Sequence, residues 1–163
     1  MNLEKTIQHL FAYHVWGTEK MLRHLEDKAE GFYNLEITSV FPSIKAVVDH
    51  VLEVDDLWFS RMIGRTAGVI LTESPKEARE KFSVLHEEIT AYLNSVDPLE
   101  NITYKTSQGE TFQNSVEELI THLVNHGTYH RGNLSAMLRQ QGIPGGSTDY
   151  IYFLRENSLK SKQ

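Results

Sequence analysis

Two histidines one helical turn apart stand out in the stretch THLVNHGTYHRGNL, residues 121–134. His126 and His130 are four residues apart, and an i, i+4 pair lies on one face of a helix, so both imidazoles can reach a single metal ion. The zinc-binding HExxH helix uses the same spacing. His122 comes four residues earlier, but an ion shared by His122 and His130 would have to span two helical turns, roughly 11 Å. We therefore expect His122 to be a neighbouring or surface group rather than a ligand.

Two imidazoles do not complete a metal site, so a third ligand must come from another helix. Residues 44–62 predict a helix with a core face of valines and Trp58, and His50 lies at the edge of that face. Three histidines with open coordination positions are typical of catalytic metal sites. From the residues alone, the alternative that His50, His126 and His130 are only hydrogen-bonded core residues is equally well supported.

Four segments with helical periodicity must position these residues, and capping signals bound them. Including their caps, the predicted helices cover residues 2–27, 43–64, 74–97 and 115–142. The sequences SPKE and SVEE, which start at Ser74 and Ser115, are capping boxes. Gly64 and Gly142 suit the left-handed position that ends a helix.

A short β-hairpin is predicted between the third and fourth helices. In NITYKTSQGETFQ, residues 101–113, apolar and polar residues alternate and Gly109 favours a turn. After the fourth helix, STDYIYFLRE predicts one or two further helical turns. We therefore predict an all-α fold, a four-helix bundle with a short hairpin, in which residues 1–163 form a single domain.

Composition argues against several classes of function. With 16 Lys and Arg against 22 Asp and Glu, the formal net charge is −6, which disfavours binding to nucleic acid. The absence of cysteine rules out disulfides, thiolate ligands and a cysteine nucleophile, and it fits a reducing cytoplasm. No apolar stretch is long enough to span a membrane, and the N-terminus does not have the pattern of a signal peptide. We expect a cytoplasmic protein without nucleic-acid or membrane partners.

Other residues are weaker candidates. Glu53 lies one turn after His50 and could orient an imidazole or act as a general base, although a solvated glutamate is the favoured interpretation. We expect the run EVDD, residues 53–56, to lie on the exposed side of its helix. The remaining histidines are interpreted as surface or helix-packing residues: His9, His14, His24 and His86. The aromatic residues are mostly packing groups, of which one or two wall a pocket: Trp16, Trp58, Tyr129, Tyr150, Tyr152 and Phe153.

Several sequence blocks together resemble the DinB/YfiT-like family of metalloenzymes. The block NHGTYHRGNL is similar to the family signature NHxTYHRGQ. The N-terminal FAYHVWGTEKML, the stretch from His50 to Trp58, the segment GETFQNSVEELITH and the closing QQGIPGGSTDYIYFLRE resemble the corresponding family segments in the same order. The resemblance therefore covers almost the whole chain.

The resemblance implies an up-down-down-up four-helix bundle, often dimeric, that binds a divalent metal ion. The implied metal ligands are His50, His126 and His130, and the metal is left open among Zn, Ni, Fe, Co and Mn. His122 matches a recurrent family histidine that is not one of the three ligands.

Four further positions are compared with the family pattern. Arg131 and Gly132 match it, and we expect Arg131 to make a structural ion pair and Gly132 to allow close helix approach. Asn133 stands where glutamine is usual and His14 where asparagine is usual. We expect neither of them to contact the proposed ligands.

The resemblance also implies chemistry, because some relatives are transferases or isomerases that use low-molecular-weight thiols such as bacillithiol. A divalent ion lowers the pKa of a bound thiol, and the thiol comes from a cosubstrate, so the lack of cysteine is no objection. The same ion could instead activate water for hydrolysis of a small-molecule substrate. A non-catalytic metal-binding or stress-response homodimer, and a plain helical bundle without metal, remain as alternatives.

Overall fold

The computed structural model describes residues 3–29 and 31–160, and these residues are mostly helical. In chain order the elements are α1 (Leu3–Glu26), the 3₁₀ turn η1 (Phe32–Asn34), α2 (Ile44–Ile63), α3 (Pro75–Leu93), β1 (Asn101–Lys105), β2 (Thr111–Ser115), α4 (Val116–Gln140) and α5 (Tyr150–Lys160). The predicted helices and hairpin are all present, although α3 ends four residues earlier than predicted. Asn2, the predicted start of the first helix, lies outside the described residues.

Serine caps fix the starts of three helices. The hydroxyls of Ser43 and Ser74 each accept a hydrogen bond from the amide three residues later. Ser115 forms a full capping box, in which the Glu118 side chain also accepts from the Ser115 amide. Gly64 ends α2 with φ 69°, a left-handed conformation that favours glycine. These local signals explain why the bounds of α2 and the starts of α3 and α4 follow the sequence closely.

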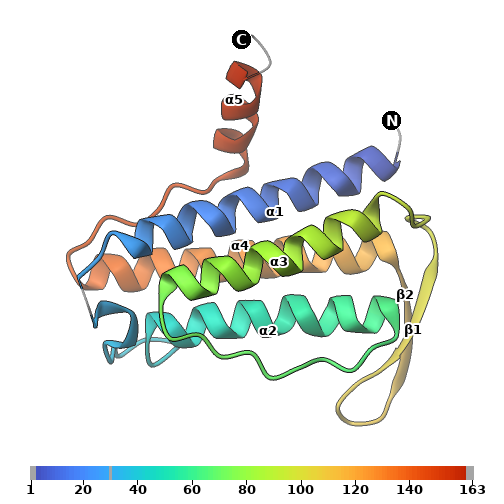
Figure 1. Cartoon of the computed structure of the whole chain (residues 1–163), viewed down its shortest axis with the longest axis horizontal. Helices are drawn as coiled ribbons and strands as arrows, with labels where there is room; N and C mark the ends of the chain where they lie inside the picture. Colours follow the sequence, from blue (N-terminus) through green and yellow to red (C-terminus); the bar gives the residue numbers. More distant parts are fainter. Residues whose placement is uncertain (1–2, 30, 161–163) are drawn as a thin grey trace.

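The four longest helices pack around a common interior. α1 contacts α3 and α4, and α2 contacts the same two helices. In Figure 1, α1 and α4 run in one direction across the view, and α2 and α3 run in the other. Their apolar faces meet at fully buried side chains such as Phe11, Leu52, Ile89 and Leu123. Burial of this surface is the main force that holds the helices together, and it places the inward-facing polar residues of all four helices near one another.

Acidic side chains of α2 hold the connection to α3, which runs back alongside α2 (Figure 1). Asp49 accepts hydrogen bonds from the Thr72 amide at 3.1 Å and the Thr72 hydroxyl at 2.6 Å. Asp56 forms an ion pair with Arg65 and accepts the Gly68 amide at 3.1 Å. These bonds hold in place the long connection that two neighbouring helices need when they run in the same direction.

The predicted exposure of residues 53–56 is wrong for both aspartates. Asp55 and Asp56 are buried, with 0% and 5% of their surface exposed. They follow the buried Leu52 by three and four residues, a spacing that puts them on the same helical face. The prediction failed because the core face of this helix was traced through apolar residues alone, so two aspartates on the same face were not assigned to it.

The hairpin leads directly into α4. β1 pairs antiparallel with β2, from Asn101 opposite Ser115 to Lys105 opposite Thr111. Gly109 lies in the turn with φ 86°, which confirms the predicted turn position. Because Ser115 is both the last residue of β2 and the N-cap of α4, the hairpin sets where α4 begins.

The last helix, α5, projects away from the other helices (Figure 1). It has 11 residues, more than the one or two turns that the sequence predicts. Its Phe153 is buried against α1, with ring centroids 5.8 Å from Tyr13 and 5.7 Å from Trp16. Among the residues described, no helix has the length and apolar character needed to cross a membrane.

Candidate metal centre

Three histidines from α2 and α4 meet at the candidate metal centre. His50 comes from α2, and His126 and His130 come from successive turns of α4. The His126 Nε2 atom lies 3.1 Å from the His50 Nε2 atom and 3.0 Å from the His130 Nε2 atom. One ligand atom of each residue falls within 4.8 Å of the others. The structure thus brings together side chains that are 76 residues apart in the chain.

The electrostatics of this group favour neutral imidazoles. Burial, together with His130 and His50, lowers the pKa of His126 to about 4. Burial, together with His50, also lowers the pKa of His130 to about 4. A neutral imidazole has one nitrogen with a lone pair, and imidazole nitrogens that face one another can form a donor set for a divalent cation. The site is therefore ready to bind an ion at neutral pH without first losing protons from these two rings.

Asn133 lies beside His130, contrary to the expectation that it would not contact a ligand. Its amide nitrogen is 3.3 Å from the His130 Nδ1 atom. The two ends of an asparagine amide have the same shape, so rotation by 180° brings its oxygen to this position as an acceptor for the Nδ1 proton. That tautomer leaves the lone pair on Nε2, and such outer hydrogen bonds are usual for metal-ligating histidines. Asn133 is therefore placed to set the tautomer of His130.

Two other candidates of the sequence do not join the three histidines. His122 is exposed, with its ring centroid 5.8 Å from that of His126, and it lies outside the converging group. Glu53 is half-buried on α2. It makes no hydrogen bond with His50, His126 or His130, all of which belong to the described part of the chain. Of the described residues, neither His122 nor Glu53 is therefore placed as an acid or base directly on the candidate centre.

A second histidine cluster lies in the interior between α1, α2 and α3. The Nε2 atoms of His14 and His86 lie 2.8 Å and 3.0 Å from the same oxygen, Oδ2 of Asp55. All three residues are buried. By donor type and spacing, this His/Asp/His group could also hold a metal ion. Sequence reasoning missed the cluster, because it assigned His14 and His86 to surface or packing roles and Asp55 to the exposed side of its helix.

Hydrogen bonds satisfy one carboxylate oxygen of this second cluster, Asp55 Oδ2, whereas Asp55 Oδ1 and His14 Nδ1 are buried without a hydrogen-bond partner among the described residues. Burial by itself would raise the pKa of Asp55, but His14 and His86 outweigh burial and hold that pKa well below its usual range. Burial lowers the pKa of His86 even though Asp55 opposes this effect. An ionised carboxylate oxygen that accepts two N–H donors is a satisfied buried group. The point where the two imidazoles converge is thus already occupied by Asp55 Oδ2.

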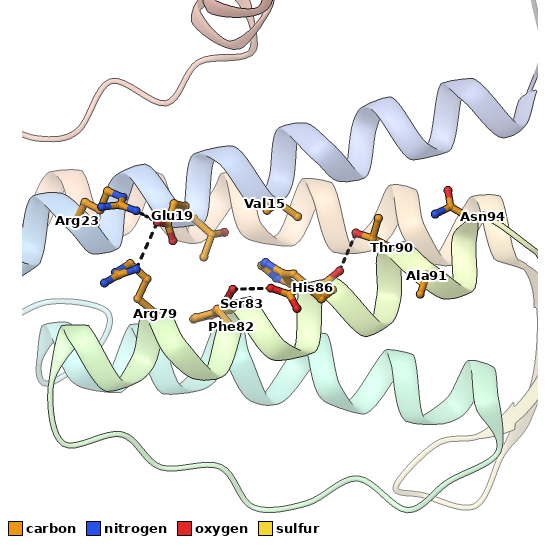
Figure 2. A pocket seen from close by; sticks show the side chains of 12 residues that line it. Val15, Glu19, Arg23, Arg79, Phe82, Ser83, His86, Thr90, Ala91 and Asn94 are labelled. Carbon is orange, nitrogen blue, oxygen red and sulfur yellow. Dashed lines mark hydrogen bonds and ion pairs between the residues drawn. The ribbon is translucent and has the colours of Figure 1, made fainter.

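A cleft between α1 and α3 reaches the second cluster at His86. It has a volume of about 550 Å³, and His86 lies in its wall. Figure 2 shows Glu19 joined to both Arg23 and Arg79 at one end of the cleft. The Glu19 carboxylate lies 2.6 Å from a guanidinium nitrogen of Arg23 and 3.6 Å from one of Arg79. None of the three converging histidines lines the cleft. The cleft therefore gives access to the second cluster and not to the candidate metal centre.

The predicted roles of Gly132 and Arg131 are wrong. A Cβ atom on Gly132 would meet open space, whereas one on Gly127 would lie 2.3 Å from the His14 ring, so Gly127 is the glycine that permits close helix approach. Arg131 is buried, but it makes no ion pair with any described residue; it donates to the Thr128 hydroxyl at 3.0 Å and lies over the Tyr13 ring. His14, which replaces the usual asparagine, is the side chain that fills the space above Gly127.

Comparison with known proteins places the chain in a family. The sequence model of the DinB family matches residues 1–161. This chain belongs to the DinB family. Among curated relatives, Protein DinB of Bacillus subtilis (strain 168) is 35% identical over an alignment 157 residues long, which covers 89% of this chain and 91% of that protein. The DinB family assignment confirms the resemblance of the sequence blocks, and it covers both helices that carry the candidate metal centre.

Proposed function

We propose that this DinB family protein binds one divalent metal ion through His50, His126 and His130. The observation that carries the proposal is the convergence of their Nε2 atoms, with neighbouring pairs 3.0 and 3.1 Å apart. Each pair of Nε2 atoms can share at most one proton, and two Nε2 lone pairs that face each other without a proton repel. A cation bound among the three Nε2 atoms would accept all three lone pairs. The donor set accepts Zn, Ni, Fe, Co and Mn.

The second cluster is the weaker candidate for this ion. In that cluster the Asp55 oxygen lies between two imidazoles and accepts from both, so no cation is needed to separate like groups. The cleft between α1 and α3 reaches His86, but His14 and Asp55 have no exposed surface. In the three-histidine group His130 is buried, whereas His50 and His126 are half-buried. A small molecule can therefore approach the three-histidine group directly from solvent, as a catalytic metal site requires.

A divalent ion held there would supply Lewis-acid chemistry, which lowers the pKa of a bound thiol or water. The chain's own residues have separate roles. Asn133 orients His130 through Nδ1, and the neutral state of His126 and His130 keeps their lone pairs available at neutral pH. The open side of His50 and His126 admits the substrate.

We infer that the reaction is the transfer of a bacillithiol-type low-molecular-weight thiol to a small electrophile. Family membership supports this inference, and because the chain has no cysteine, the reacting thiol has to come from a cosubstrate. A metal-dependent hydrolase, with water in place of the thiol, is the alternative reaction. A non-catalytic metal-binding or stress-response protein is the alternative without chemistry.

The experiment uses protein purified without a histidine tag and loaded with Zn²⁺ or Co²⁺. We expect about one ion per chain and metal-dependent conjugation of bacillithiol to 1-chloro-2,4-dinitrobenzene or monobromobimane. His126→Ala should lose both properties, while His9→Ala, an exposed histidine on α1, should keep both. Ester hydrolysis without thiol conjugation would support the hydrolase, and metal binding without either reaction would support the non-catalytic protein.

We further propose that residues 1–163 form one up-down-down-up four-helix bundle that assembles into a cytoplasmic homodimer. The helix directions in Figure 1 support the topology. The projecting α5 supports the dimer, because it exposes Ile151 and Tyr152, with 48% and 39% of their surfaces accessible. In light scattering, the wild-type protein should have the mass of a dimer, and Ile151→Glu should have that of a monomer. A monomeric wild type would contradict the assembly proposal.

A further inference from the structure

Two aromatic rings border the three-histidine group on the His130 side. The Phe41 ring centroid lies 5.4 Å from that of His50 and 5.5 Å from that of His130. The Tyr129 ring meets the His130 ring edge-on at 5.0 Å. We call Phe41 and Tyr129 the aromatic rim. They come from different elements, since Phe41 precedes α2 and Tyr129 lies on α4.

The side chains of the aromatic rim are partly or largely exposed to solvent. Tyr129 has 63% of its surface exposed, and among the described residues its ring contacts only that of His130. Phe41 is half-buried and packs against the edge of the core. Neither the stability of α4 nor that of the core requires Tyr129 to stand beside a histidine. Exposed aromatic surface next to polar groups is typical of ligand sites, because a ligand can cover it.

Trp58, on the other side of the group, differs in this respect. The Arg61 guanidinium lies over the Trp58 ring at 4.4 Å, and the rings of Tyr104 and His122 meet it at 5.0 and 5.1 Å. Trp58 is half-buried, and residues of the chain itself contact its ring from several sides. Tyr129 of the aromatic rim has a larger exposed surface and fewer ring contacts among the described residues.

We propose that the substrate of this site carries a planar apolar group, an aromatic ring or a conjugated system, that packs on Phe41 and Tyr129 while its donor atom faces the three Nε2 atoms. This inference rests on the proposed metal site and names the class of molecule that the site selects. Aromatic pairs prefer offset or edge-to-face contacts with centroids about 4.5–7 Å apart, and both rim residues already make such contacts with the His130 ring, at 5.5 and 5.0 Å. Such a group would also exclude water from the exposed side of the site.

The test compares two probes on the Co²⁺-loaded protein, imidazole and 4-phenylimidazole, by titration of the visible d–d absorption. Both bind a metal through the same ring nitrogen, and only one carries a planar apolar group. We expect 4-phenylimidazole to bind roughly tenfold more tightly, the effect of one or two aromatic contacts. Equal affinities would overturn the inference while leaving the metal site intact. Absence of bound Co²⁺ would overturn the metal site, and the inference with it.

Variants assign the preference to the aromatic rim. Tyr129→Ala and Phe41→Ala should each reduce the preference for 4-phenylimidazole several-fold, with little change for imidazole. Tyr129 is exposed, so its variant remains informative even where Phe41→Ala weakens packing. Phe112→Ala is the matched control, because Phe112 is 48% exposed on the hairpin and its ring contacts only Tyr104 among the described residues. A preference that survives both rim variants, or that falls equally in the control, would contradict the proposal.

Discussion

The two histidine clusters of this protein have nearly the same spacing but different third members. In one, His126 Nε2 lies about midway along a chain of three imidazoles; in the other, Asp55 Oδ2 lies between two imidazoles at similar distances. Asp55 Oδ2 accepts both N–H groups, so no ion is needed at the point where the two imidazoles converge, although Asp55 Oδ1 stays buried without a partner among the described residues. The nitrogen of a third imidazole has a single lone pair and cannot accept two N–H groups as a carboxylate oxygen does, which is why we propose that a cation binds there. On this proposal, the residue type at the centre distinguishes a structural cluster from a metal-binding one.

The two histidine clusters also differ in how deeply some of their members are buried. Asp55 and His14 have no exposed surface, which suits a cluster whose hydrogen bonds contribute to folding stability. His50 and His126 are half-buried, which suits a centre that exchanges ligands with solvent. We therefore predict that changes in the three-histidine group alter metal binding, whereas changes in the cluster around Asp55 alter stability.

Replacement of the central carboxylate should have the largest effect. Asp55→Asn removes the charge that accepts two buried N–H groups, so we expect a loss of about 3 kcal/mol in the free energy of unfolding of the metal-free protein. Urea unfolding measures this loss. Asp27→Asn, an exposed aspartate beyond the end of α1, should change stability by less than about 0.5 kcal/mol. A similarly small change in Asp55→Asn would mean that the carboxylate is not the centre of a stabilising cluster.

Crowding above Gly127 gives the next largest effect. In Gly127→Ala the new methyl group would lie 2.3 Å from the His14 ring, so the ring must move away from Asp55. We expect a loss of about 2 kcal/mol in thermal or urea unfolding. Gly132→Ala is the control on the same helix, where nothing lies near the added methyl, and helix propensity predicts a gain of up to about 1 kcal/mol. Losses of equal size in both variants would contradict the assigned packing.

Replacement of Asn133, which contacts the proposed ligand His130, should change the affinity for metal and not the free energy of unfolding. Asn133→Ala removes the group that sets the His130 tautomer, and we expect roughly tenfold weaker binding of Zn²⁺ in competition with a chelator. Asn125→Ala, an exposed asparagine on the same helix, should bind as the wild type does. Unchanged affinity in Asn133→Ala would show that the contact with His130 does not affect the tautomer.

The smallest expected effect concerns the metal-free three-histidine group. His126→Ala should change the free energy of unfolding of the metal-free protein by no more than about 0.5 kcal/mol, because it removes a crowded, unsatisfied ring. His86→Ala, which removes a donor to Asp55, should cost about 2 kcal/mol in the same assay. Equal losses of stability in the two variants would mean that the two clusters contribute equally to the stability of the metal-free protein, which would contradict the proposed difference.

The sequence predicted the three-histidine group because its signal is local. His126 and His130 share one helical face by their spacing, and His50 is the single histidine on the other helix that faces them. The second cluster has no such signal. His14, Asp55 and His86 are single polar residues on three helices, 41 and 31 residues apart in the contacting pairs, and only the packing of those helices joins them. Tracing the core face of α2 through Leu52 and Phe59 regardless of residue type would have placed Asp55 inside.

Helix starts were predicted well for the same local reason, since a capping serine acts within one turn. The contacts of single glycines were not predictable in this way. Gly127 and Gly132 both lie on α4, and only the position of α1 decides that Gly127 faces His14. The length of α5 was also underestimated, because its burial depends on Phe153 packing against α1.

Anomalous diffraction from crystals of the Co²⁺-loaded protein tests the difference between the clusters most directly. We predict one strong peak at roughly 2.0–2.2 Å from the Nε2 atoms of His50, His126 and His130, and no peak between His14, Asp55 and His86. The peak should disappear in a His126→Ala, His130→Ala double variant. A peak at Asp55, or one that survives the double variant, would contradict the assignment of metal binding to the three-histidine group.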